Sequence, residues 1–152
     1  MTERRTKLQL HQGFALAALG LVTTQVILGQ LLLNSENSGA ENHTLKTLHL
    51  VNAIAASGIY WTAAYMSITA PEIEDKGDKH STDTVTIHKT LAWVHGTGMV
   101  ISPFLGWYMT RKANSAETQG EVDKARKLRS IHQIVGYTTA GALFGAFAVM
   151  TF

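Results

Sequence analysis

Residues 8–33 of this protein read LQLHQGFALAALGLVTTQVILGQLLL, a continuous stretch with no Asp, Glu, Lys or Arg. Three further uncharged blocks follow in the 152-residue chain, at 47–70, 90–110 and 130–152. An α-helix rises 1.5 Å per residue, so about 20 residues cross a hydrocarbon core of about 30 Å. Each block is long enough, and together they predict four transmembrane helices. The alternative is a soluble four-helix bundle, but its helices would each show a charged face, which these blocks lack.

The connections between the blocks are too short to hold a second domain. Successive spans joined in this way run up, down, up and down. We therefore expect an all-α transmembrane four-helix bundle that forms a single membrane domain over residues 1–152. Residues 117–129 contain no proline, which predicts that the last helix starts before the membrane. The first block exceeds the apolar part of a cleavable signal peptide, about 7–15 residues, and is expected to stay as a helix.

Composition excludes several classes of function. The chain has no cysteine, so disulfides, zinc–thiolate sites and covalently attached haem are excluded. A net charge of +2 does not suggest a nucleic-acid partner.

We expect an integral protein of a bacterial plasma membrane. The basic residues divide six against seven between the two sides of the predicted topology, so they do not orient it.

Histidines carry the chemistry of the predicted spans. His11, His49, His95 and His132 each lie one or two helical turns inside a membrane entry point. Because the helices alternate in direction, His11 and His95 fall near one face, and His49 and His132 near the other. Two imidazoles per layer suit haem iron, whose other four ligands come from the porphyrin. Zinc would need four ligands in one place, which this division does not supply. The pattern predicts two non-covalent haem b groups with bis-histidine ligation.

The third block offers a second histidine. His88 lies two helical turns before His95, so both lie on nearly the same helix face. His88 is adjacent to Lys89 and is expected at the interface, where it would pair with a haem propionate. His95 lies about 10 Å deeper and is the predicted ligand. His43 and His80 fall in polar connections and are expected to have no part in the site.

Other polar residues are expected to have secondary roles in cofactor binding. Gln25 lies about 21 Å along the helix from His11, which predicts a position near the opposite haem. A hydrogen bond between helices explains Gln25 equally well. Lys46 and Arg129 are expected to neutralise haem propionates or to anchor the chain at lipid headgroups. Gly98 and Gly136 would give room for a porphyrin or allow close helix packing.

Four short motifs resemble the helices of the cytochrome b561-type transmembrane core. They are His11-x13-Gln25-x3-Gly29, Lys46-x2-His49, His95-Gly96-x2-Met99 and His132-x3-Gly136, and they cover all four predicted spans. The resemblance implies a four-helix bundle with two b haems, one near each face. It also implies ligands from the first and third helices for one haem, and from the second and fourth for the other.

The expected function is electron transfer across the membrane between a quinol or soluble donor and an acceptor. A haem-bearing anchor subunit of a larger redox complex is the first alternative, and a haem-free transporter or structural protein is the second. The sequence shows no nucleophile triad, phosphate loop or paired carboxylates. An oxidoreductase activity stays open, with the quinone pool or a redox protein as partner.

Overall fold

The computed structural model describes residues 2–39, 42–71 and 84–151 of the chain. These residues form four helices, α1 (Thr2–Asn37), α2 (His43–Ile68), α3 (Thr84–Asn114) and α4 (Gln119–Thr151). Each helix contains nearly all of one uncharged block. The prediction of an all-α chain with one helix per block is therefore confirmed. The acidic connection that contains His80 lies outside the described residues.

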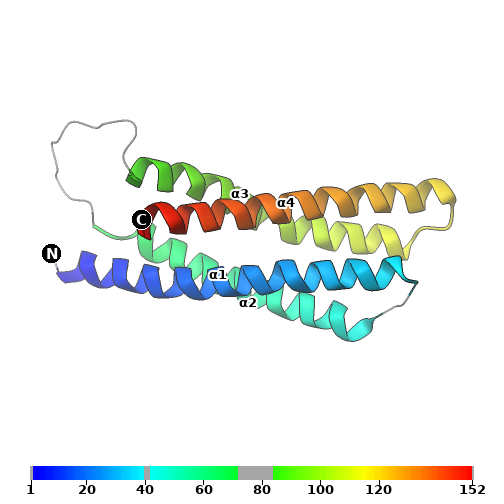
Figure 1. Ribbon diagram of the computed structural model, residues 1–152, viewed down its shortest axis with the longest axis horizontal. Coiled ribbons are helices and arrows are strands. Elements are labelled where there is room, and N and C mark those ends of the chain that lie inside the picture. Colours follow the sequence, from blue (N-terminus) through cyan, green and yellow to red (C-terminus); the bar gives the residue numbers. More distant parts are fainter. Residues whose placement is uncertain (1, 40–41, 72–83, 152) are drawn as a thin grey trace. The chain divides into compact units, whose positions relative to one another are not determined.

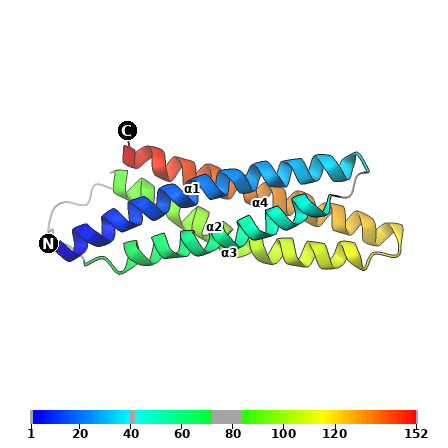
Figure 2. The same cartoon turned by 90° about the horizontal axis from the view of Figure 1, so that it is seen from below.

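The chain divides into two compact units, Met1–His80 and Ser81–Phe152. In the first unit α1 packs beside α2, and in the second α3 packs beside α4 (Figures 1 and 2). Contacts between paired helices run in opposite order along the sequence: His11 contacts Ala63, whereas Gln25 contacts His49. Each unit is therefore an antiparallel helical hairpin, which confirms the up-down order within each pair. We call them the first and second hairpins.

Local hydrogen bonds fix the starts of two helices. The side chain of Asn42 accepts a hydrogen bond from the amide of Leu45 and caps α2. At α4, the carboxylate of Glu121 accepts hydrogen bonds from the amides of Glu117 and Thr118, both at 3.0 Å. Thr118 and Glu121 form a capping box. Helix α4 thus begins at Gln119, three turns before its uncharged block, as predicted.

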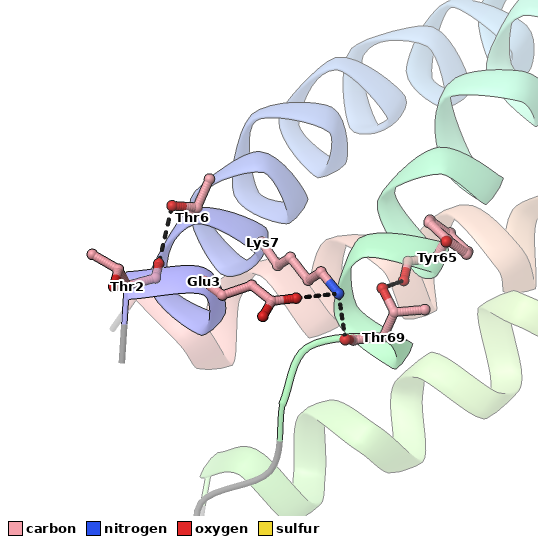
Figure 3. A network of polar contacts seen from close by, with 6 residues as sticks. All are labelled: Thr2, Glu3, Thr6, Lys7, Tyr65 and Thr69. Atoms are coloured by element: carbon pink, nitrogen blue, oxygen red, sulfur yellow. Dashed lines mark hydrogen bonds and ion pairs between the residues drawn. The ribbon is translucent and has the colours of Figure 1, made fainter.

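A polar network joins the start of α1 to the end of α2 (Figure 3). The ammonium group of Lys7 donates to the carbonyl of Thr69 at 2.8 Å and forms an ion pair with Glu3 at 3.1 Å. The last carbonyls of a helix have no partner within it, and the negative end of the helix dipole favours a cation there. Lys7 therefore caps the C-terminus of α2 and joins it to the start of α1.

Small side chains allow the paired helices to approach closely. In the second hairpin the backbone of Gly98 lies so near Thr139 that a Cβ atom at Gly98 would overlap the threonine side chain. In the first, Ala18, Ala56 and Ala63 are at most 3% exposed. Large apolar side chains lie outside instead: Ile54, Trp93 and Phe104 are 66%, 80% and 69% exposed. Small residues thus fill the contact between paired helices, and many of the large apolar side chains of the described helices are exposed.

Two of the four described helices, α1 and α4, contain a stretch long and apolar enough to cross a membrane. By length and composition alone, two such helices are weak evidence for a membrane protein, because the core helix of a soluble protein passes the same test. A signal sequence also passes it, and α1 lies near the N-terminus. The blocks in α2 and α3 lack charge but contain His, Asn, Ser, Thr and Gly, which lower their hydropathy. The absence of charge therefore predicts four membrane spans, whereas the hydropathy of the described helices supports only two.

Candidate functional site

His11 lies near the start of α1 and reaches across to the last turns of α2. Its Nδ1 is 2.9 Å from the carbonyl oxygen of Ala63. A carbonyl can only accept a hydrogen bond, so Nδ1 carries the proton and the lone pair of the neutral ring is on Nε2. Histidines that bind metals through Nε2 are commonly held in this way by a second-shell acceptor. The first hairpin therefore orients His11 in the tautomer that suits an iron ligand.

His88 makes the same contact in the second hairpin. Its Nδ1 is 2.9 Å from the carbonyl oxygen of Ala146, near the end of α4. The same argument places the proton on Nδ1 and the lone pair on Nε2. His88 is half-buried, like His11. His88, which the sequence placed at a haem edge, thus has the same geometry as His11, the ligand predicted on α1.

His49 lies near the start of α2, at the other end of the first hairpin, against Gly29. A Cβ atom at Gly29 would lie 3.1 Å from Cε1 of His49, so a larger residue there would displace the ring by a few tenths of an ångström. The amide nitrogen of Gln25 is 3.0 Å from Nε2 of His49. Asn52 donates to the other end of the Gln25 amide at 2.7 Å and to the carbonyl of Leu21 at 3.0 Å. Because the amide oxygen of Gln25 accepts from Asn52, its NH₂ group is the end that faces His49.

His132 occupies the corresponding place in the second hairpin, near the start of the uncharged part of α4. A Cβ atom at Gly106 would lie 3.3 Å from Cε1 of His132. The ring also forms a hydrogen bond with the backbone of Ser102. His49 and His132 are both half-buried. Each hairpin therefore holds two half-buried histidines that are well separated along its length.

His95 has a different environment. It lies two turns further along α3 than His88 and is 7% exposed, so it is buried where the other four are half-buried. Gly98, one turn beyond it, packs against Thr139 and serves helix packing. A Cβ atom at Gly136 would meet no heavy atom within 4 Å. His43 is exposed at the first residue of α2.

The matched contacts correspond to a repeated spacing in the sequence. On the first helix of each hairpin the pattern is His-x17-Gly, which His11 and Gly29 share with His88 and Gly106. On the second helix it is His-x8-Gly-x4-Ala, which begins at His49 in one hairpin and at His132 in the other. The alanines of this second pattern are Ala63 and Ala146. The internal repeat is the sequence signal for the roles of Gly106 and the two alanine carbonyls, which single-motif reasoning missed.

The repeat also includes the two basic residues predicted to bind propionates. Lys46 and Arg129 each precede a histidine of the second pattern by three positions, which places them one turn away on the same helix face. Both are half-buried. The pair Gln25 and Asn52 is not repeated, because Ser102 and Val135 stand at the corresponding positions. Asn52 gave no signal in sequence, since its role depends on contact with another helix.

Comparison of the chain with known protein families, with curated proteins and with solved structures yields no match. Within the described part of each hairpin, no three His, Cys, Asp or Glu side chains converge as ligands of a metal ion. His11 and His88 are each held by a backbone carbonyl, and His49 and His132 are each placed against a glycine. A neutral imidazole with its lone pair on Nε2, as at His11 and His88, is the kind of ligand that binds haem iron.

Proposed function

We propose that this protein is a membrane-embedded cytochrome with two b haems, which carries electrons across a membrane. One observation carries the proposal: each hairpin holds one half-buried histidine bonded to a backbone carbonyl and one placed against a glycine, at the same spacing in both hairpins. In the pairing predicted from the sequence, His11 and a histidine of α3 would hold one haem, and His49 and His132 would hold the other. The haems are not covalently attached, because the chain has no cysteine.

The tautomers and the glycines support this assignment. Because Nδ1–H of His11 is bonded to a carbonyl, the lone pair is on Nε2, the nitrogen that would hold iron, and the bond would raise the basicity of that nitrogen. Gly29 and Gly106 leave the rings of His49 and His132 room that a Cβ atom would take. The basic residues one turn from these rings would neutralise propionates. Bound haem supplies reversible one-electron chemistry, and two histidine ligands leave iron no open position.

Four transmembrane spans are part of the proposal. The uncharged blocks have the required length, and the large apolar side chains of the described helices are mostly exposed. Histidines inside hydrocarbon are costly and usually functional. The resemblance to the cytochrome b561-type core leads to the same topology. A bacterial plasma membrane is the expected location.

The electron donor would be a quinol of the membrane pool or a soluble redox protein. A second role, as the haem-bearing anchor subunit of a larger redox complex, is favoured by the short connection between α3 and α4, residues 115–118. That connection offers little surface for a soluble partner. Purification from native membranes separates the two roles, because an anchor subunit would co-purify with its partner subunits.

Haem content of the purified full-length chain tests the proposal. We expect about two haems b per polypeptide by the pyridine haemochrome assay, and two low-spin signals by EPR. His49→Ala and His132→Ala should each remove the same low-spin signal, and His11→Ala the other one. His43→Ala, at an exposed position on α2, is the matched control and should keep both. A wild-type chain without haem, or loss of one common signal in His11→Ala and His49→Ala, would contradict the proposal.

A further inference from the structure

We propose that His88, and not His95, is the haem ligand on α3. This inference rests on the proposed function, because it assigns a ligand of one of the proposed haems. It departs from the sequence argument, which placed His88 at the haem edge because Lys89 follows it. The structure shows in addition how the partner helix of each hairpin holds each histidine, which the sequence of one helix does not show.

The contacts of His88 repeat those of His11 atom by atom. In both residues Nδ1 is 2.9 Å from a backbone carbonyl oxygen, of Ala63 for His11 and of Ala146 for His88. The two alanines hold corresponding positions in the repeat. Both rings are half-buried and share the tautomer with the lone pair on Nε2. His88 is therefore held in the same orientation and tautomer, within its own hairpin, as the ligand predicted on α1.

The spacing along each hairpin supports the same choice. His11 and Gly29, against which His49 packs, are separated by about 27 Å along α1. The interval between His88 and Gly106, against which His132 packs, is identical. His95 and Gly106 are separated by only about 16 Å along α3. The spacing of His88 from Gly106 therefore repeats that of His11 from Gly29, whereas the spacing of His95 does not.

His95 corresponds in the repeat to Ala18, which has no ligand atom. Ala18 is 1% exposed and His95 is 7% exposed, so this position is buried in both hairpins. Gly98 and its close contact with Thr139 lie one turn away on α3. We assign His95 to helix packing rather than to the haem.

Alanine variants of the full-length protein, purified in detergent, test the assignment. We expect His88→Ala to lower haem content from about two to about one per chain, or to turn one low-spin EPR signal into a high-spin signal. The signal lost should be the one lost in His11→Ala. We expect His95→Ala to keep both low-spin signals. His95→Leu, which keeps a large side chain at the buried position, provides the second readout if His95→Ala folds poorly.

A methionine variant gives a signature that a structural role would not produce. Met with His as axial ligands keeps haem iron low-spin and raises its reduction potential. In His88→Met, one haem should therefore stay low-spin and titrate at a higher potential, while the other haem is unchanged. His95→Met should leave both potentials as in the wild type.

The results separate this inference from the proposed function. A wild-type chain with two haems whose His88→Ala variant keeps both low-spin signals overturns the inference alone. Loss of a signal in both His95→Ala and His95→Leu, with His88→Ala intact, would assign the ligand to His95. A wild-type chain that binds no haem overturns the function and this inference with it.

Discussion

The imidazole of His49 packs directly against Gly29, and a Cβ atom at that glycine would lie 3.1 Å from Cε1 of the ring. The same relationship joins His132 and Gly106, at 3.3 Å. Both distances are tighter than an ordinary van der Waals contact. The glycines therefore fix where the two rings lie, at corresponding places in the two hairpins.

Alanine at either glycine should displace the ring that it faces. We expect Gly29→Ala to alter the EPR signal and reduction potential of the haem bound by His49, and Gly106→Ala to alter the same haem through His132. Gly58→Ala is the matched control, because a Cβ atom there meets nothing within 4 Å. It should leave both signals unchanged and stabilise α2 by roughly 0.5–1 kcal/mol, since alanine is the better helix former. Equal spectral effects of all three variants would contradict the steric role.

Gln25 makes a contact that iron would have to replace. Its NH₂ group donates to Nε2 of His49, the nitrogen that would bind iron. A hydrogen bond contributes about 1 kcal/mol net, which is roughly a fivefold change in an equilibrium. We therefore expect Gln25→Leu to hold the haem at His49 roughly fivefold more tightly, as measured by haem transfer to an acceptor protein. Ser102→Ala, at the corresponding position of α3, is the control. Weaker retention in Gln25→Leu would instead indicate that the amide binds a propionate.

Gly98 and Thr139 should be coupled energetically. A Cβ atom at Gly98 would overlap the hydroxyl of Thr139 and lie 2.9 Å from its Cβ. We expect Gly98→Ala to destabilise the second hairpin by about 1–3 kcal/mol through overpacking. Adding Thr139→Ala should recover only part of this loss, because Cβ of residue 139 remains. Thermal unfolding of the two single variants and the double variant measures the coupling. Fully additive effects would show that the two residues do not touch.

The start of α4 should loosen in acid. Hydrogen bonds from the Glu117 and Thr118 amides lower the pKa of Glu121 from its ordinary value of 4.5. The folded-state pKa is depressed, so this stabilisation is present above pH 4.5 and is lost as the pH falls through the lower, folded-state value. Hydrogen exchange of the first turn of α4 should accelerate over that range in the wild type. Glu121→Gln should remove the pH dependence, whereas Asp123→Asn, in the same turn, should keep it.

Charge placement alone predicted the helices because a membrane-length helix needs a continuous uncharged stretch, and that is a property of the chain itself. The absence of proline from residues 117–129 predicted that α4 begins before its uncharged block. The four-span topology was a stronger inference than hydropathy supports, since only α1 and α4 of the described helices have a sufficiently apolar stretch. The histidines were recognised as candidate ligands by residue type and depth, both of which can be read along one helix.

The choice between His88 and His95 shows where this reasoning stops. Both lie on nearly the same face of α3, and depth alone favoured His95. Only the pairing of α3 with α4 places Ala146 beside His88, and only the pairing of α1 with α2 shows the same contact at His11.

The sequence by itself determined where the helices form and which residue types each one carries, because helical propensity and the distribution of charge are local. The tertiary structure decided which glycine faces which ring, which carbonyl sets the tautomer of each histidine, and that Asn52 directs the amide of Gln25 at His49. Those contacts join residues that are far apart in the chain and belong to different helices. They depend on how two helices are aligned against each other, which is set by small-residue packing across the hairpin and is not encoded in either helix alone.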